Sequence, residues 1–131
     1  MTTHILALGG GGFSMSNRGE PTALDRHILD LSGKSSPLVC FAPTAAADDP
    51  VYVNRFLAAY SALGVRNMVL TLWQGAAESV ERLSQADIVV SGGGSAANLM
   101  ALWKTHGVDH VIRRMLAADS DVVLAGGSAG E

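Results

Sequence analysis

One serine near the end of the chain has neighbours that suit a nucleophile. The segment "VVLAGGSAGE" (residues 122–131) places Ser128 in the pattern Gly-x-Ser-x-Gly, with Gly126 two residues before it and Gly130 two residues after. Glycines at these positions allow a sharp strand-to-helix turn, because larger residues would collide with the neighbouring strand and the incoming helix. Such a turn exposes the hydroxyl, and the N–H of Ala129 could donate a hydrogen bond to an oxyanion beside it. The alternative is a serine in an ordinary glycine-rich turn.

Two other glycine-rich segments could contribute to the same site. Residues 92–94, in "SGGGSAANL", could bring a second N–H to the oxyanion, or could form a tight turn in which Ser95 caps the next helix. Residues 9–12, in "LGGGGF", suit a flexible loop at the mouth of a site. They lack the helix start and the acidic residue of a dinucleotide-binding fingerprint, and no glycine segment continues as a P-loop. The candidate substrate-loop residues are Gly93, Ser95, Gly11 and Gly12.

The other residues that could take part in catalysis or bind a metal do not complete a catalytic set. A serine nucleophile needs an adjacent base. The four histidines are His4, His27, His106 and His110. His106 and His110 have the i, i+4 spacing of a metal pair, but Gly107 lies between them and no third ligand is evident, so we predict no metal site. Cys40, the only cysteine, excludes an internal disulfide and lies in the apolar run "PLVCFAP", where we expect a buried thiol.

The segments that would position these residues alternate between strands and helices. Strands are predicted over residues 4–8, 37–42, 66–72, 87–91 and 121–125, mostly as continuous apolar runs. Helices are predicted from Pro21 to Gly33, over 53–63, over 76–84 and over 96–118 with a break near Gly107. The second helix would bury a stripe that includes Phe56, Leu57 and Tyr60. This alternation predicts one α/β domain, residues 1–131, with helices on both faces of a mostly parallel sheet. Each glycine segment follows a strand, so all three are expected at one edge of that sheet.

The composition bears on two questions, namely whether the protein binds nucleic acid or membranes and where in the cell it is located. The 131 residues are 48% apolar and 16% charged, and the formal net charge is −3. The basic residues are scattered, so we predict no nucleic-acid or membrane partner. No apolar run approaches the roughly 20 residues of a membrane span, and the N-terminus lacks the basic region of a signal peptide. A cytoplasmic location is therefore expected.

The order of four blocks resembles a known family over the whole 131 residues. The blocks "ILALGGGGF", "CFAPTAA", "ADIVVSGGGSAANLMALWKTHGVDHVI" and "VVLAGGSAG" are similar to the peptidase E and cyanophycinase family of serine peptidases. The resemblance implies a flavodoxin-like, three-layer αβα fold related to class I glutamine amidotransferases. It also implies hydrolysis of short peptides through an acyl-enzyme, with Asp-X dipeptides as the best-known substrates, and no cofactor.

The resemblance assigns roles to three residues of this chain. Ser128 matches the nucleophile, Ala129 the first oxyanion donor and Gly94 the second. The family usually has Asn-Thr after the glycines where this chain has Ser95 and Ala96, so only the backbone role of Gly94 carries over. The family's catalytic histidine and its acidic partner lie in a later part of its sequence. We therefore expect these 131 residues to be the nucleophile-bearing part of an enzyme completed by a C-terminal remainder, on the same chain or a second one.

Two other functions are compatible with the same fold. One is a non-catalytic module that binds a small ligand or anion at a helix N-terminus. The other is an amidotransferase-like hydrolase, which is less favoured because that relative usually has a cysteine where this chain has Ser128. The expected partner is a small peptide substrate, and exposed apolar helix faces would permit a homodimer.

Overall fold

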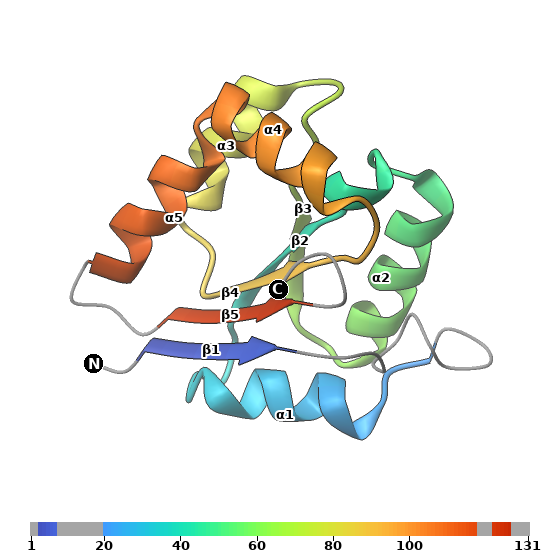
Figure 1. Ribbon diagram of the computed structural model, residues 1–131. Coiled ribbons are helices and arrows are strands. Elements are labelled where there is room, and N and C mark those ends of the chain that lie inside the picture. Colours follow the sequence, from blue (N-terminus) through green and yellow to red (C-terminus); the bar gives the residue numbers. More distant parts are fainter. Residues whose placement is uncertain (1–2, 8–19, 118–121, 127–131) are drawn as a thin grey trace.

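Five strands form a parallel sheet at the centre of the protein in the computed structural model, which describes residues 3–7, 20–117 and 122–126 (Figure 1). The described strands are β1 (Thr3–Ala7), β2 (Leu38–Ala42), β3 (Arg66–Val69), β4 (Ile88–Ser91) and β5 (Val122–Gly126). Every neighbouring pair of them is parallel. The predicted strands are confirmed to within one residue, except that β3 ends three residues earlier than predicted.

The order of the strands creates a crevice at the centre of the sheet. Across the sheet the order is β1-β5-β4-β2-β3. Counted from β2, the strands β2 to β5 follow the 2-1-3-4 order of flavodoxin-like sheets, and β1 lies beside β5. The direction of winding reverses between β2 and β4. In parallel α/β sheets, ligands bind at the carboxyl ends of the strands at such a reversal.

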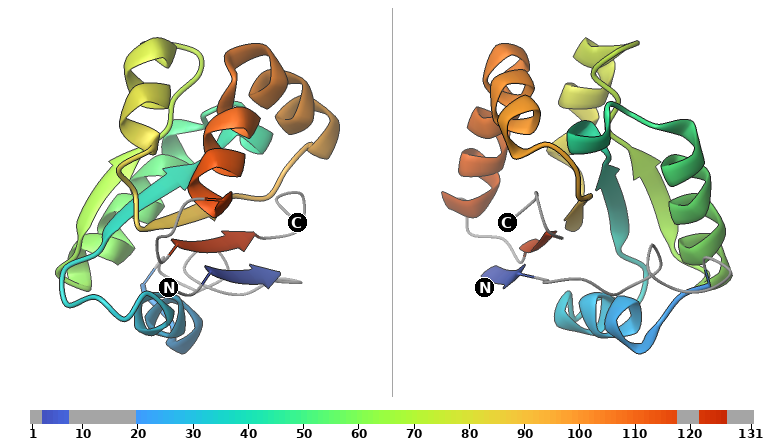
Figure 2. Two further views of the ribbon diagram at one scale, coloured as in Figure 1. Left: turned by 90° about the vertical axis from the view of Figure 1, so that its left-hand side faces the viewer. Right: turned by 45° about the vertical axis from the view of Figure 1, so that its right-hand side comes forward.

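Helices cover both faces of the sheet, which confirms the three-layer αβα architecture (Figures 1 and 2). One layer contains α1 (Ala23–Leu31) and α2 (Pro50–Ala62), and the other contains α3 (Ala76–Leu83), α4 (Ala96–His106) and α5 (Val108–Ala117). A short 3-10 helix, η2 (Thr44–Ala46), follows β2. The predicted break in the last helical segment is confirmed at Gly107, whose φ of 74° ends α4 in a left-handed conformation.

The side chains of each strand alternate between the two helical layers. In β2, Val39 and Phe41 belong to the apolar cluster beneath α1 and α2, whereas Cys40 and Ala42 belong to the cluster beneath α3, α4 and α5. All four side chains are fully buried. The prediction of strands covered on both faces is therefore confirmed for β2, β4 and β5, whereas Ile5 in the edge strand β1 is 73% exposed. Burial also raises the pKa of the Cys40 thiol to about 12, so this cysteine is an inert core residue, as predicted.

Aromatic packing orients α2 on the sheet and corrects one prediction. Phe56 stacks on Phe41 with ring centroids 4.7 Å apart, and Tyr60 stacks on Phe56 at 4.8 Å. The predicted burial of Leu57 is wrong, because Leu57 is 36% exposed and Ala59 is buried in its layer. The buried face of α2 therefore consists of positions 56, 59 and 60, which have the i, i+3, i+4 spacing of a helical stripe.

A buried hydrogen bond ties α1 to α2. Thr22 and Asp25 form a capping box at the start of α1, in which the Thr22 N–H donates to Asp25 Oδ2 at 2.8 Å. The other carboxylate oxygen, Oδ1, accepts from the hydroxyl of Tyr60 at 2.9 Å. Asp25 is only 2% exposed. Burial, reinforced by the neighbouring Asp25 charge, raises the pKa of Tyr60 well above its ordinary value.

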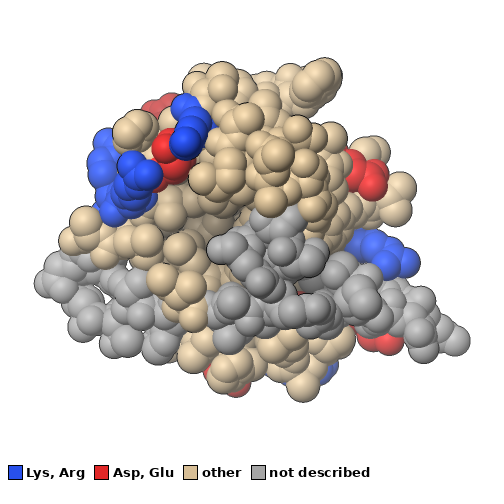
Figure 3. All heavy atoms as spheres, in the orientation of Figure 1, with Lys and Arg blue, Asp and Glu red and all other residues tan. Residues whose placement is uncertain are grey.

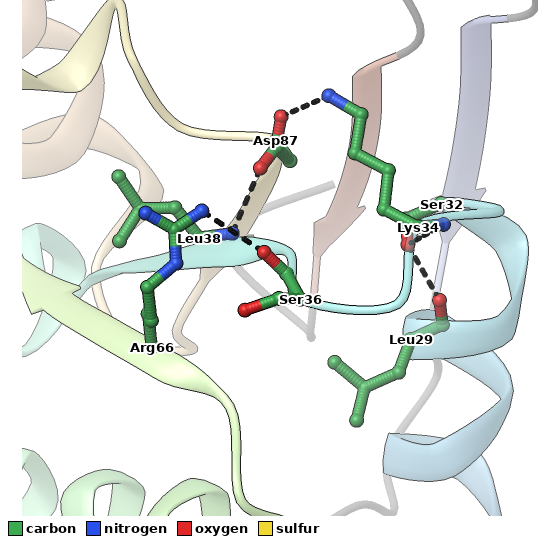
Figure 4. Close-up of polar contacts among 7 residues, drawn as sticks. All are labelled: Leu29, Ser32, Lys34, Ser36, Leu38, Arg66 and Asp87. Carbon is green, nitrogen blue, oxygen red and sulfur yellow. Dashed lines mark hydrogen bonds and ion pairs between the residues drawn. The ribbon is translucent and has the colours of Figure 1, made fainter.

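Charged residues gather at the amino edge of the sheet, opposite the strand ends that could carry chemistry. Asp87 pairs with Lys34, and its Oδ2 accepts from the N–H of Leu38 at 2.8 Å (Figure 4). Arg66 donates to the carbonyl of Ser36 at 2.9 Å. A hollow of about 650 Å³ at this edge is lined by Lys34 and Asp87 together with residues of α3 and α5. These contacts join the starts of β2, β3 and β4.

The surface combines charges of both signs. On the face shown in Figure 3, Lys and Arg side chains lie beside Asp and Glu side chains and form no continuous basic area. Lys34 forms an ion pair with Asp87, and Arg82 forms one with Glu78. Among the helices that the structure describes, none has both the length and the apolar character that a membrane span needs.

Candidate active site

The strands that lead into the three glycine segments end side by side. In the register of the sheet, Gly126 of β5 is paired with Ala7 of β1 on one side and with Ser91 of β4 on the other. The glycine segments therefore begin at one edge, as the strand pattern predicted. Ser128, Ala129, Gly11 and Gly12 lie outside the described residues, so their assigned roles stay predictions. The segment after β4, residues 92–95, lies within the described part of the chain.

The loop after β4 is fixed by backbone donors. The loop comprises residues 92–95, and three of its four N–H groups donate to oxygens of neighbouring segments. These bonds are Gly92 N to Ala42 O at 3.0 Å, Gly93 N to Tyr52 Oη at 3.2 Å and Ser95 N to Ala45 O at 2.8 Å. The remaining N–H, that of Gly94, has no acceptor among the residues that the structure describes. The amide predicted to bind the oxyanion is thus the one that the loop leaves available.

Of the glycines that the structure describes, Gly94 is the one at which a side chain is excluded most strongly. Its φ is +145°, a conformation that favours glycine. A Cβ atom there would overlap the carbonyl oxygen of Ala45 and lie 2.5 Å from the carbonyl carbon. The loop after β4 therefore presses its backbone against η2, the first turn after β2. Close backbone approach, rather than flexibility, explains the glycine at position 94.

Tyr52 contacts the same loop from α2, in the helical layer that also contains α1. Its hydroxyl accepts from the Gly93 N–H, and its ring would lie only 2.9 Å from a Cβ atom on Gly92. The ring itself is held edge-on against Phe41, with centroids 4.9 Å apart. Sequence reasoning missed Tyr52, because it lies 41 residues before Gly93 and nothing in its own segment indicates the contact.

Two serines border the loop in different ways. The side chain of Ser95 accepts from the Asn98 N–H at 3.2 Å and caps α4, so the capping interpretation of this residue is confirmed. Ser91, the last residue of β4, is 6% exposed, and its hydroxyl has no hydrogen-bond partner in the described part of the chain. This buried hydroxyl lies beside Gly126 in the sheet register. Sequence reasoning did not single it out.

The described histidines do not gather at this edge. His27 is exposed on α1, and His106 and His110 lie on either side of Gly107. His106 ends α4, whose eleven residues extend about 16 Å from the end that Ser95 caps. Within residues 3–7, 20–117 and 122–126, no group of three His, Cys, Asp or Glu side chains is placed to hold a metal. His4 lies in β1.

Comparison with known proteins relates both sequence and fold to peptidases. The family model for Peptidase family S51 matches residues 5–131. The uncharacterized peptidase YgaJ of Bacillus subtilis strain 168 is 39% identical over 127 residues, which cover 96% of this chain and 54% of that protein. These matches confirm the family resemblance seen in the glycine-rich blocks.

Two solved structures share the fold. A provisionally named peptidase E protein from Listeria monocytogenes EGD-e has a TM-score of 0.69 at 21% identity, over 98% of this chain and 59% of that one. A peptidase from an acI-B1 actinobacterium has a TM-score of 0.74 at 20% identity, over 96% of this chain and 54% of that one. The chain thus spans between half and three fifths of the length of each of these relatives.

Proposed function

The chain belongs to peptidase family S51, and on that premise we propose that it carries the nucleophile of a serine peptidase acting on short peptides. The observation that carries the proposal is the available N–H of Gly94, which is held at the same edge of the sheet where β5 leads into the Gly-x-Ser-x-Gly segment. A hydrolase needs a nucleophile and an oxyanion donor close together, and the sheet brings the two segments onto neighbouring strands.

In the proposed reaction, the Ser128 hydroxyl oxygen attacks the carbonyl carbon of the scissile peptide bond. A histidine contributed by the remainder of the enzyme takes the hydroxyl proton and passes it to the leaving amine. The oxygen of the tetrahedral intermediate accepts hydrogen bonds from the N–H groups of Gly94 and Ala129. Collapse of this intermediate releases the amine and leaves an acyl-enzyme on Ser128, which water then hydrolyses by the same steps.

The contribution of Gly94 rests on preorganisation. The bonds of Gly92, Gly93 and Ser95 hold the loop before substrate arrives, so the donor need not reorient as charge develops on the carbonyl oxygen. A single preorganised oxyanion donor contributes about 10²- to 10³-fold to the rate of an acyl-transfer enzyme. The close contact between Gly94 and the Ala45 carbonyl of η2 also limits how far the loop can move.

Ser128→Ala in the full-length protein tests the assignment of the nucleophile. We expect the variant to lose reaction with a fluorophosphonate probe and to lower kcat/KM for dipeptide hydrolysis by about 10⁴-fold or more. Ser84→Ala removes an exposed hydroxyl at the amino edge and should leave both readouts unchanged. Hydrolysis that survives Ser128→Ala would contradict the proposal, and absence of both labelling and hydrolysis in the wild-type protein would favour a binding module.

For specificity, we propose dipeptides and include Asp-X dipeptides as the first to test, since the family resemblance implies them. Initial rates on Asp-Leu, Glu-Leu, Leu-Leu and a tetrapeptide that begins with aspartate separate the possibilities. A higher kcat/KM for Asp-Leu than for the other three substrates is the expected order. Equal values for Asp-Leu and Leu-Leu would show that the enzyme is a broader dipeptidase.

A further inference from the structure

A second pocket adjoins the Gly94 loop on the side of β2 and β3. Its volume is about 340 Å³, and it lies between the loops after these two strands and the first turns of α4. Thr44, Asp48, Leu72, Trp73, Asn98 and Leu102 line it. Residues 44–48 connect this pocket with the candidate active site, because the same short segment contains Ala45, whose carbonyl contacts Gly94 and accepts from the Ser95 N–H.

Asp48 gives this pocket a negative charge. It is the one charged residue among those that line the pocket. Its Oδ2 accepts from the N–H groups of Leu72 at 2.8 Å and Trp73 at 3.1 Å. Its Oδ1 is buried and has no hydrogen-bond partner among the described residues. A buried carboxylate oxygen without a partner leaves the negative charge incompletely compensated, so a cationic group held in the adjoining pocket would be stabilised by that charge.

The backbone that holds Asp48 is strained. Ala47 and Asp48 have φ values of 56° and 55°, in the left-handed region that residues other than glycine rarely adopt. The Asp48 N–H donates to the carbonyl of Pro43 at 3.1 Å, which fixes this turn together with the two bonds to Oδ2. Strain of this kind persists only where surrounding contacts enforce it, and it is concentrated at ligand-binding sites.

Trp73 supplies the second element of a cation site. Its side chain is 83% exposed, although large aromatic side chains are usually buried in part. It lines the same pocket as Asp48 and is joined to it through its own backbone N–H. A carboxylate and an exposed aromatic residue that line one pocket, with apolar walls provided by Leu72 and Leu102, are a combination that suits ammonium and guanidinium groups.

We propose that this pocket binds a positively charged group of the peptide substrate, an ammonium or a guanidinium. The inference rests on the proposed function, because it takes the substrate to be a peptide whose scissile carbonyl lies at Gly94. Strands are about 4.8 Å apart, so the loops after β2 and β3 lie about 5–10 Å from β4. One to three residues of extended peptide cover that distance. In a dipeptide, a Lys or Arg side chain after the scissile bond covers it as well and therefore reaches the pocket, whereas the N-terminal amine, only two bonds from the scissile carbonyl carbon, stays near Gly94.

Binding to the full-length Ser128→Ala protein tests the inference without requiring turnover. The ligands are Asp-Lys, Asp-norleucine and their N-acetylated forms, with dissociation constants measured by calorimetry. We expect loss of the side-chain ammonium, in Asp-norleucine, to raise Kd about tenfold with either the free or the acetylated amine. If Asp-norleucine binds as tightly as Asp-Lys, the inference is overturned.

Asp48→Asn identifies the residue responsible. Asparagine keeps a side-chain oxygen for the N–H groups of Leu72 and Trp73 but removes the charge, so the tenfold preference for the charged ligand should disappear. Asp49→Asn is the matched control, since Asp49 is exposed, caps α2 through the Val51 N–H and does not line the pocket. Equal effects of the two variants would mean that general electrostatic attraction, and not this pocket, produces the preference.

Trp73→Ala provides a second check that does not disturb the strained turn. Because Trp73 is largely exposed, its removal should leave the fold intact and reduce the preference for the cation about two- to fivefold. An unchanged preference in both Asp48→Asn and Trp73→Ala would overturn the inference. If the cation preference depends on Asp48 but the wild-type protein hydrolyses no peptide, the pocket assignment stands and the proposed function fails. Hydrolysis without such a preference gives the reverse result.

Discussion

Gly94 combines two demands that no other residue type meets. Its backbone conformation is unfavourable for a side chain, and the Ala45 carbonyl occupies the position that a Cβ atom would take. Its N–H is also the donor that the loop leaves available. The geometry of the loop and the proposed chemistry therefore depend on the same absence of a side chain.

Gly94→Ala should lower kcat/KM for dipeptide hydrolysis about 10²- to 10³-fold, because the loop must move away from Ala45 and take the oxyanion donor with it. Gly64→Ala is the matched control. Gly64 has a φ of +73° with open space around it, so alanine there costs only the conformational strain of about 1–2 kcal/mol. The free energy of unfolding should fall more for Gly94→Ala than for Gly64→Ala. Equal losses together with unchanged activity would contradict the structure of this loop.

At the scale of elements, the contact between α1 and α2 depends on one buried hydroxyl. Tyr60→Phe keeps the stacked ring but leaves Asp25 Oδ1 without its partner, which should lower the free energy of unfolding by about 1.5–3 kcal/mol at pH 7. Chemical denaturation monitored by circular dichroism measures this loss.

The same variant has a pH signature whose sign is fixed by the raised pKa of Tyr60. Above pH about 10 the tyrosine ionises in the unfolded chain but stays protonated in the folded protein, so wild-type stability falls as pH rises through this range. Tyr60→Phe should lack this component and show a smaller loss between pH 9 and 11. A variant that loses stability as steeply as the wild-type protein would show that Tyr60 titrates normally.

The elements themselves follow closely from local patterns. Apolar runs place the strands, and Gly107 at the end of α4 marks the break before α5 because glycine adopts the left-handed conformation there. The end of β3 could not be predicted in this way. Leu70 and Leu72 are as buried as strand residues, although β3 ends at Val69. The Leu70 N–H still donates to the Phe41 carbonyl of β2, but the N–H groups of Leu72 and Trp73 donate to Asp48 and not to a strand. A buried strand and a buried loop therefore have the same run of apolar residues, and the sequence cannot distinguish them.

The candidate site was predictable only in part for a related reason. Glycines that follow strands indicate the edge where chemistry occurs, and strand order then brings the loop after β4 next to β5. The residues that hold this loop, Ala45 and Tyr52, come from other segments and have no unusual neighbours in the sequence. Contacts between distant loops depend on the assembled sheet, so local patterns contain no signal for them.

At the scale of the whole molecule, the two edges of the sheet have different tasks. The amino edge is joined by Asp87, which binds the Leu38 N–H and pairs with Lys34 (Figure 4). The carboxyl edge contains the loops of the candidate site. Changes at one edge should therefore affect stability with little effect on chemistry at the other.

Asp87→Ala tests this separation. The Leu38 N–H loses its acceptor, so the free energy of unfolding should fall by about 1–3 kcal/mol, whereas kcat/KM at a temperature well below unfolding should stay within about twofold of wild type. Asp87→Asn retains an acceptor and should lose less stability. A large loss of activity in the folded Asp87→Ala protein would show that the two edges are coupled.

The turn after β2 serves two places at once, since Ala45 fixes the Gly94 loop and Asp48 lines the neighbouring pocket. Selection for a new substrate that lengthened or shortened this turn would alter the reaction rate in the same step. Diversification of such enzymes should therefore proceed by exchange of side chains around a turn of constant length. An engineer who wishes to change specificity has the same constraint and should vary Trp73 or Asn98 before inserting residues.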